Sequence, residues 1–375
     1  MPMKKSIPIT RPTLEPFSAY QAYFEKSITT GMLTYNSTMR EFEGKVAEYL
    51  GVKYAVAVSS CTAGLMLTMR GLGLTGEVIM PSFTFAASGL PLVWNNLTPV
   101  FVDIDPRTFT VDVENVEALI TKKTSAIFAT HVFGVPCNIT VLEKVAKKHN
   151  LKLIFDAAHA FGSEYKNKKV GSFGDAEVFS LSPTKVLTAG EGGIVATNDK
   201  NLAEYVRQGR NYGDDGTSKT SFAGLSARMS ELHAGVGLIS LKGLKKNLKN
   251  RIAQAEFYKK ELQKIEPGFV FQHIPDTALT NYKDLSILID PAIVGYTREQ
   301  LQEYLLSQGI MTRSYFYPAL HTFTTYAPKR KTVLPVTDTI TAHVLSLPLY
   351  SHMTQEEVLH VTGTIATFIH DRKKS

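Results

Sequence analysis

The stretch LKLIFDAAHAFGSEYKNKKVGSFGDAEVFSLSPTK, residues 151–185, decides the fold. It holds two short runs of apolar and β-branched residues, Leu151–Asp156 and Ala176–Leu181, which we predict to be buried strands. Asp156 closes the first run, and Lys185 follows the second. Because ligands of open α/β sheets bind beyond the carboxyl ends of the strands, we expect both side chains to face one site.

The same alternation of strand-like and helical patterns continues on both sides of this stretch. Apolar runs predict further strands at Tyr54–Val58, Glu77–Met80, Pro99–Asp103, Ser125–Thr130 and Gly193–Thr197. Helical patterns between them predict helices at Ser37–Tyr49, Cys61–Gly71, Phe85–Asn95, Asp112–Thr121 and Thr140–His149. Strands that alternate with helices indicate an α/β fold with a mainly parallel central sheet, covered on both faces.

The pattern changes after about residue 198. It predicts one long, charge-studded helix at Ser230–Lys264, strands at Phe269–Gln272 and Asp284–Ile289, and helices at Arg298–Gln308 and Gln355–Arg372. We therefore expect a large domain over residues 1–250, including the N-terminal segment, and a smaller C-terminal α/β domain over residues 251–375.

Composition places the chain among ordinary globular proteins. It has 375 residues, 44% of them hydrophobic, and 41 basic against 34 acidic side chains give a net charge of +7. Two cysteines are too few for a disulfide framework or a cysteine-based zinc site, so we expect no metal. The basic excess is typical of solvated helical faces and would also attract phosphorylated substrates, while no nucleic-acid motif accompanies it. We see no signal peptide and no membrane span, and we expect a cytoplasmic protein.

Asp156 and Lys185 together suggest covalent catalysis with a pyridine cofactor. An aspartate at this place can accept a hydrogen bond from a protonated pyridine nitrogen and so keep the ring an electron sink. It can also simply cap the turn that begins at Ala157. Lys185 stands among apolar and small residues, and burial would lower its pKa and free a nucleophilic amine. An isolated lysine is usually exposed, so the prediction depends on the pair.

Three further features fit a phosphorylated, planar cofactor. The loop Ser59–Gly64 joins a predicted strand to a predicted helix, and hydroxyl and N–H groups at a helix N-terminus bind phosphate. An ordinary capped helix is the alternative. Ser180, five residues before Lys185, could add another hydroxyl. Phe85 could stack on the cofactor or belong to the core.

Ten segments, in order along the chain, carry a resemblance to a known family. They are GMLT from Gly31, FEGKVAEYLGV from Phe42, SCTAGL from Ser60, PSFTF from Pro81, VFVDID from Val100, HVFG from His131, DAAHAFG from Asp156, SLSPTK from Ser180, GEGG from Gly190 and GLSARMSE from Gly224. Together they resemble the DegT-type, pyridoxal-phosphate-dependent nucleotide-sugar aminotransferases. That family has the aspartate aminotransferase-like (fold type I) architecture, which the resemblance therefore implies.

The resemblance implies a role for each matching residue. Lys185 would bind the cofactor covalently and shuttle a proton between cofactor and sugar, while Asp156 would pair with the pyridinium nitrogen. Relatives with histidine in place of this lysine are sugar dehydratases, so Lys185 favours transamination. The remaining implied contacts are Phe85 on the cofactor ring, Cys61, Thr62 and Ser180 on the phosphate, His159 near the ring hydroxyl, and Glu191 near the sugar.

Three positions depart from the family pattern. Cys61 stands where the phosphate loop usually has glycine, and Asn36 replaces the last glycine of an early Leu-Thr-x-Gly pattern. Ser226 stands where the family has an asparagine that reaches the phosphate across a dimer interface, and a serine retains a hydroxyl donor. The resemblance thus implies a homodimer with shared active sites.

The segment RSYFYPALH, Arg313–His321, together with DAAHAFG, most resembles enzymes that aminate dTDP-4-keto-6-deoxyglucose at C4. The implied partners are a nucleotide-linked keto-sugar and an amino-acid donor, glutamate in the family, in amino-sugar and cell-surface polysaccharide (lipopolysaccharide) biosynthesis. The candidates for substrate binding are Arg313, Tyr315, Tyr317, His321 and, for the substrate phosphates, Arg228. The tyrosines could instead form a partly buried aromatic cluster.

Three alternatives stay open. An aminotransferase for a 3-keto-sugar or a keto-cyclitol would have the same cofactor site. A Rossmann oxidoreductase shares the fold class, but no Gly-x-Gly-x-x-Gly follows an early strand. The third is a non-enzymatic sensor or partner module, and the intact pair of Lys185 and Asp156 argues against it.

Overall fold

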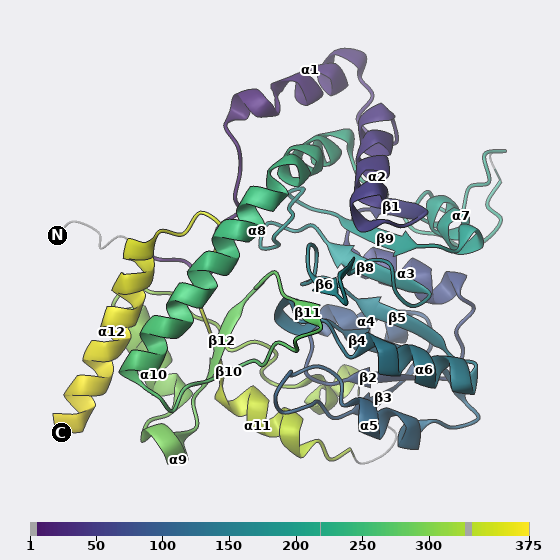
Figure 1. Ribbon diagram of the computed structural model, residues 1–375. Helices are drawn as coiled ribbons and strands as arrows, with labels where there is room; N and C mark the ends of the chain where they lie inside the picture. The colour runs from purple at the N-terminus through teal and green to yellow at the C-terminus, as the bar shows by residue number, and fades with distance from the viewer. Residues whose placement is uncertain (1–5, 218, 327–331, 375) are drawn as a thin grey trace.

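A seven-stranded sheet forms the centre of the computed structural model, which describes residues 6–217, 219–326 and 332–374 (Figure 1). The strand order is β1-β9-β8-β5-β4-β2-β3. The strands are β1 Tyr54–Val58, β2 Glu77–Pro81, β3 Thr98–Val102, β4 Thr124–Thr130, β5 Lys152–Asp156, β8 Ala176–Ser180 and β9 Gly193–Thr197. Only β9 is antiparallel to its neighbours in this sheet, which confirms the predicted α/β fold with a mainly parallel sheet.

Helices cover both faces of this sheet. Successive strand residues point to opposite faces, so in β1 Val56 and Val58 pack with α3, whereas Ala55 and Ala57 pack with α2. The helices of the N-terminal part are α1 Gln21–Thr30, α2 Ser37–Leu50, α3 Cys61–Gly71, α4 Ala86–Trp94, α5 Val113–Val116, α6 Ile139–His149 and α7 Lys200–Gly209. The continuous apolar runs of the sequence therefore reflect strands that are buried on both faces.

The predicted helix at Asp112–Thr121 is shorter than expected. It forms α5, followed by a 3₁₀ turn at Glu117–Leu119. The chain leaves the helix because Ile120 is extended and the Thr121 N–H donates to Thr124 Oγ1 at 2.9 Å, which turns the chain into β4.

The C-terminal part has a sheet and an apolar core of its own. Its sheet has the order β10-β12-β13, with β10 Val270–Phe271, β12 Leu285–Leu288 and β13 Val344–Leu347. Its helices are α9 Pro291–Val294, α10 Arg298–Ser307, α11 Pro335–His343 and α12 Gln355–Lys374, and α12 lies along the long helix α8, Glu231–Ile265 (Figure 1). The predicted boundary after residue 250 falls inside α8, and the division into two domains stays a prediction.

Several elements were not predicted from the sequence. They are α1, α7, α9, α11, β13, a small sheet of β6 Glu164–Tyr165, β7 Lys168–Lys169 and β11 Ala278–Leu279, and the 3₁₀ turns at Phe17–Ala19, Val132–Gly134, Leu320–Thr322 and Thr324–Tyr326. Two-residue strands and single turns carry no periodicity that a sequence can show. No helix among the described residues is long and apolar enough to cross a membrane.

One edge of the central sheet gathers the carboxyl ends of six strands. β2, β3, β4, β5 and β8 run parallel, and β1 runs in the same direction as β8 because both are antiparallel to β9. Thr130, Asp156 and Ser180 are the last residues of β4, β5 and β8. This edge is the place where an α/β sheet binds its ligand.

Candidate active site

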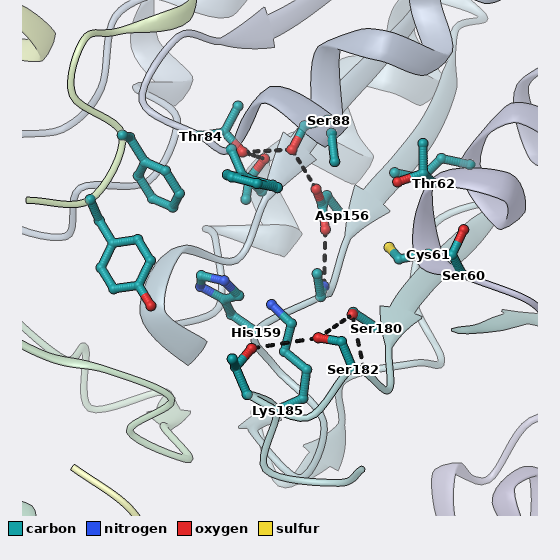
Figure 2. Close-up of a pocket in the computed structure, with 18 of the residues that line it drawn as sticks. Ser60, Cys61, Thr62, Thr84, Ser88, Asp156, His159, Ser180, Ser182 and Lys185 are labelled. Carbon is teal, nitrogen blue, oxygen red and sulfur yellow. Dashed lines mark hydrogen bonds between the residues drawn. The ribbon is translucent and has the colours of Figure 1, made fainter. Parts of the chain in front are cut away.

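A cavity of about 310 Å³ lies at this edge of the sheet (Figure 2). Its walls come from the loops after β1, β2, β5 and β8 and from the segment 313–316 of the C-terminal part. The sequence-predicted residues that line it are Cys61, Thr62, Phe85, Asp156, His159, Ser180, Lys185, Glu191, Arg313 and Tyr315. Residues more than 250 positions apart in the sequence, such as Cys61 and Tyr315, thus meet in one cavity.

Asp156 is held in one orientation at the end of β5. Its Oδ1 accepts a hydrogen bond from the Ala158 N–H at 2.9 Å, and its Oδ2 accepts one from Ser88 Oγ at 2.6 Å. The residue is only 5% exposed. Asp156 therefore caps the turn that begins at Ala157, which was one of the two expected roles, and these hydrogen bonds also hold its carboxylate in place at the cavity.

Lys185 lies in a tight loop between β8 and β9. The loop is closed by hydrogen bonds from Leu181 N to Gly192 O and from Ala189 N to Leu181 O, both 2.9 Å, and Lys185 N donates to Ser182 O at 3.0 Å. The side chain points into the cavity beside His159 (Figure 2).

Loss of water around Lys185 lowers the pKa of its amine below the ordinary value. The negative charges of Asp284 and Asp156 oppose this shift, and the positive charge of Arg313 adds to it. Burial therefore makes the neutral, nucleophilic amine more accessible than in an ordinary lysine.

His159 is a neutral imidazole with a free nitrogen. Burial, together with the charges of Lys185 and Lys283, lowers its pKa well below the usual range. Its ring lies beside the rings of Phe133 (6.3 Å, 15°) and Phe316 (6.1 Å, 23°), which also stack on each other, and its Nδ1 has no hydrogen-bond partner. The nearest charged oxygen, Asp284 Oδ2, is 3.9 Å from Nδ1. A buried, unpartnered nitrogen on a cavity wall is suited to a polar group of a ligand.

The N-terminus of α3 forms another wall of the cavity. Ser60 Oγ accepts from the Ala63 N–H at 3.1 Å and so caps the helix, while Cys61 and Thr62 line the cavity. The first N–H groups of a helix have no intrahelical partner and attract anions. Burial raises the pKa of the Cys61 thiol, which keeps it uncharged next to such an anion.

Hydroxyl groups line the cavity on the side of the lysine loop. Ser180 Oγ lies 3.4 Å from Ser182 Oγ, and Ser182 Oγ lies 3.5 Å from Thr184 Oγ1. These long hydrogen bonds leave all three hydroxyls able to turn toward a bound anion.

Four sequence-predicted residues lie outside the cavity of this single chain. The exposed Ser226 bonds to Tyr212 Oη at 3.0 Å, and the guanidinium of Arg228 stacks on the Tyr212 ring at 5.3 Å. Arg313 and Tyr315 alternate along the chain and both face the cavity. Phe316 has a positive φ of 61°, which turns the backbone and ends this alternation, so the next residue, Tyr317, is 59% exposed. His321 is held elsewhere.

Two polar contacts hold His321 away from the cavity. Its Nδ1 lies 2.8 Å from Ser82 Oγ, and its Nε2 lies 3.3 Å from Asp338 Oδ1. Its assignment to substrate binding is therefore not supported by this geometry. The assignment of Ser226 concerns a second subunit and stays a prediction.

Several residues of the site were not predicted from the sequence. Thr84, Ser88 and Thr130 line the cavity beside Asp156, and Phe316 lines it beside Tyr315. Thr130 ends a predicted strand, as Asp156 does, so the strand-end argument could have found it. Nothing in the sequence signals the buried pair of Lys283 and Asp284, whose Nζ and Oδ1 atoms are 3.0 Å apart.

These residues fit the pyridoxal phosphate that the sequence resemblance implies. The groups that fit it are a lysine of lowered pKa, a fixed carboxylate, an unpartnered imidazole nitrogen and a helix N-terminus with hydroxyls beside it. The exposed ring of Phe85, 61% accessible, stands at the same cavity and is free to stack on a planar ring. Among the described residues, no group of three or more His, Cys, Asp or Glu side chains is placed to hold a metal ion.

The fold and the cavity define the chain as an enzyme of the aspartate aminotransferase-like class, fold type I, dependent on pyridoxal phosphate. Residues 18–366 match the DegT/DnrJ/EryC1/StrS aminotransferase family, and the chain belongs to that family. It is a sugar aminotransferase.

Near full-length relatives accompany this family match. The chain is 34% identical over 366 residues to a dTDP-4-amino-4,6-dideoxy-D-glucose transaminase of Shigella dysenteriae (97% of this chain, 99% of the relative). It is 34% identical to a dTDP-3-amino-3,6-dideoxy-alpha-D-galactopyranose transaminase of Aneurinibacillus thermoaerophilus (92% of this chain, 94% of the relative). The crystal structure of DesI in the presence of its TDP-sugar product matches with a TM-score of 0.93 and 36% identity (99% of this chain, 96% of DesI).

Proposed function

We propose that the enzyme transfers an amino group from an amino acid, glutamate by family resemblance, to C4 of a nucleotide-linked keto-6-deoxysugar, dTDP-4-keto-6-deoxyglucose. The observation that carries the proposal is the cavity in which the lysine of lowered pKa, Lys185, faces the fixed carboxylate Asp156. The choice of sugar is supported by near full-length similarity to the Shigella dysenteriae transaminase, and similarity to DesI supports a TDP-linked sugar.

The proposed roles of the residues follow from their places. Bound pyridoxal phosphate supplies an electron sink that lets an amino group pass from an amino acid to a ketone. Lys185 would bind the cofactor and move a proton, since its amine loses charge more readily than an ordinary lysine. Asp156 would hold the ring nitrogen, and the N-terminus of α3, with Ser180, would bind the phosphate.

Arg313, Tyr315 and Glu191 are the proposed contacts of the sugar substrate. All three line the cavity, and the guanidinium of Arg313 stacks on the Tyr315 ring at 5.4 Å. Arg313 and Glu191 are exposed at the cavity wall, where a nucleotide-linked sugar can reach them.

We further propose that the enzyme works as a homodimer in the cytoplasm. Large apolar side chains are exposed along the N-terminal segment, and exposed apolar patches mark interfaces. They are Leu14, Phe17, Ile28, Met32, Leu33 and Tyr35. A second subunit covering this region would be placed to bring Ser226 and Arg228 to its partner's cavity.

A second candidate substrate is a 3-keto-sugar. The Aneurinibacillus thermoaerophilus relative is a 3-amino-sugar transaminase and is as identical to this chain as the 4-amino relative, at 34% each. The cofactor site would be the same for both, so the position of amination depends on the shape of the sugar site.

A panel of substrates tests this proposal. Purified enzyme with pyridoxal phosphate and glutamate is offered dTDP-4-keto-6-deoxyglucose, a dTDP-3-keto-6-deoxysugar, GDP-4-keto-6-deoxymannose and a keto-cyclitol, and amino-sugar formation is followed by mass spectrometry. We expect the highest kcat/KM for dTDP-4-keto-6-deoxyglucose. Preference for the 3-keto-sugar or the cyclitol would overturn the choice of sugar, and no transfer to any nucleotide sugar would overturn the substrate class.

A further inference from the structure

A row of buried hydroxyl groups leads to Asp156. Thr130 Oγ1 donates to Thr84 Oγ1 at 3.2 Å, Thr84 Oγ1 lies 2.8 Å from Ser88 Oγ, and Ser88 Oγ donates to Asp156 Oδ2 at 2.6 Å (Figure 2). The exposed fractions of Thr130, Thr84 and Ser88 are 5%, 2% and 1%. We call Thr130, Thr84 and Ser88 the hydroxyl chain.

The carboxylate fixes the direction of every hydrogen bond in the hydroxyl chain. A hydroxyl has one proton to donate. Ser88 donates its hydrogen bond to Asp156, which as a carboxylate can only accept. Thr84 must therefore donate to Ser88, and Thr130 must donate to Thr84. All three dipoles consequently point the same way, and hydrogen bonds aligned in this manner strengthen one another.

The hydroxyl chain joins elements that are far apart in the sequence. Thr130 ends β4, Thr84 lies in the loop between β2 and α4, Ser88 lies in the first turn of α4, and Asp156 ends β5. The contacts therefore connect three neighbouring strands of the sheet at the edge where the cavity opens.

We propose that the hydroxyl chain is a positioning device for Asp156, which keeps the carboxylate charged and fixed so that the ring nitrogen of the cofactor retains its proton. This rests on the pairing of Asp156 with that nitrogen under the proposed function. Hydrogen-bond donors stabilise a charged carboxylate relative to its protonated form. Without them, Asp156 would take a larger share of the proton that it holds in common with the ring nitrogen.

Other charged and titratable groups also act at this place. The charge of Asp156 acts on the Lys185 amine and on the neutral Cys61 thiol, and His159 lies on the same cavity wall. Asp284 and Arg313 act on Lys185 from the C-terminal part. None of these groups belongs to the hydroxyl chain, so substitutions in the chain leave the surrounding charges unchanged.

The test is a pH titration of the absorbance of the bound cofactor. A ring that loses its positive charge withdraws less electron density from the Lys185 nitrogen that joins the cofactor to the protein. That nitrogen then keeps its proton to higher pH, and the midpoint of the absorbance titration rises. We expect Ser88→Ala to raise the midpoint by about one pH unit, because a hydrogen bond to a charged group changes an equilibrium roughly tenfold. Thr84→Val and then Thr130→Val should raise it by progressively smaller amounts.

Matched variants separate positioning from packing. Thr84→Ser and Thr130→Ser keep the hydroxyl and remove a methyl group, so they should lower the melting temperature without moving the midpoint. A Ser88→Ala enzyme that binds the cofactor with an unchanged midpoint would overturn the proposal, as would equal shifts in the Ser and Val variants. If Ser88→Ala fails to fold, the two Val variants decide the question in the same way.

Asp156→Asn distinguishes failure of this proposal from failure of the proposed function. Asparagine cannot carry the charge, so it should raise the midpoint more than Ser88→Ala and weaken cofactor binding, measured as a dissociation constant. An unchanged midpoint and binding constant in Asp156→Asn would contradict the proposed role of Asp156 itself. A shift in Asp156→Asn with none in Ser88→Ala would contradict only the role of the hydroxyl chain.

Discussion

Two carboxylates from different parts of the chain act on the charge of the Lys185 amine. Asp156 ends β5, and Asp284 precedes β12 and is paired with Lys283, whose pKa burial lowers to about 8. Asp284 is the group that most strongly opposes the lowering of the Lys185 pKa. The protonation of Lys185 thus depends on a residue that the sequence analysis did not single out.

Asp284→Asn should shift the reactivity of Lys185 to lower pH. A carboxylate favours the protonated amine, so its removal lowers the pKa of Lys185 further. We expect the midpoint of the rate of cofactor uptake by the apo-protein, followed by absorbance against pH, to fall by about one unit.

Glu191→Gln provides the control for this experiment. Glu191 lines the same cavity but is not among the groups that shift the pKa of Lys185, so the midpoint should stay where it is in the unchanged protein. A midpoint that rises in Asp284→Asn, or that moves equally in both variants, would refute the electrostatic role of Asp284.

At the scale of elements, the phosphate site depends on how closely β9 approaches α3. A Cβ placed on Gly193, the first residue of β9, would lie 2.6 Å from Cys61 N and 2.6 Å from Ser60 C. Both are backbone atoms, which cannot rotate away as a side chain can. The N-terminus of α3 must therefore shift whenever this glycine gains a side chain.

Gly193→Ala should accordingly weaken cofactor binding. Crowding of this kind costs about 1–3 kcal/mol, which corresponds to a roughly 5- to 150-fold increase in the dissociation constant. The constant is measured by titrating apo-protein with pyridoxal phosphate. Gly44→Ala in α2, where a Cβ meets nothing within 4 Å, is the matched control and should leave binding unchanged. Equal binding by the two variants would contradict the close-approach argument.

Elements with strong local patterns could be predicted from the sequence. The strands β1 and β9 and the helix α3 have the predicted bounds, because each combines an apolar run with a clear start or end signal such as the Ser60 cap. Contacts between distant residues could not be predicted in this way. Glu231, for example, accepts hydrogen bonds from the backbone N–H groups of Asn36, Thr38 and Met39 at the start of α2. No local sequence pattern predicts that contact.

At the scale of the whole molecule, the strand ends predicted the cofactor side of the cavity better than the substrate side. Asp156, Lys185 and the N-terminus of α3 meet because strands of one direction end at one edge. His321 does not join them, because the backbone turn at Phe316 interrupts the segment that was assigned to the substrate as a whole. The path of such an irregular segment depends on tertiary contacts and not on periodicity.

The proposed shared active site predicts recovery of activity when subunits are mixed. Lys185→Ala lacks the reactive amine, and Ser226→Glu would repel the phosphate in its partner's cavity. Each variant alone should be nearly inactive, whereas a mixed dimer contains one cavity with both residues intact. We expect activity to appear after subunit exchange, and light scattering to give the mass of two chains.

The control for the mixing experiment uses two variants whose substituted residues belong to the same cavity of one chain. Lys185→Ala mixed with Asp156→Ala should stay inactive, because both side chains line the same cavity of a single chain. Recovery in this control, or a strictly monomeric active enzyme, would rule out the shared site.

The central claim is that Lys185 carries the cofactor, and reduction with borohydride tests it most directly. The purified protein should be yellow after incubation with pyridoxal phosphate, and reduction followed by peptide mass mapping should find the cofactor attached to the peptide that contains Lys185. Attachment to another lysine such as Lys283, or a protein that stays colourless and takes up no cofactor, would contradict the account.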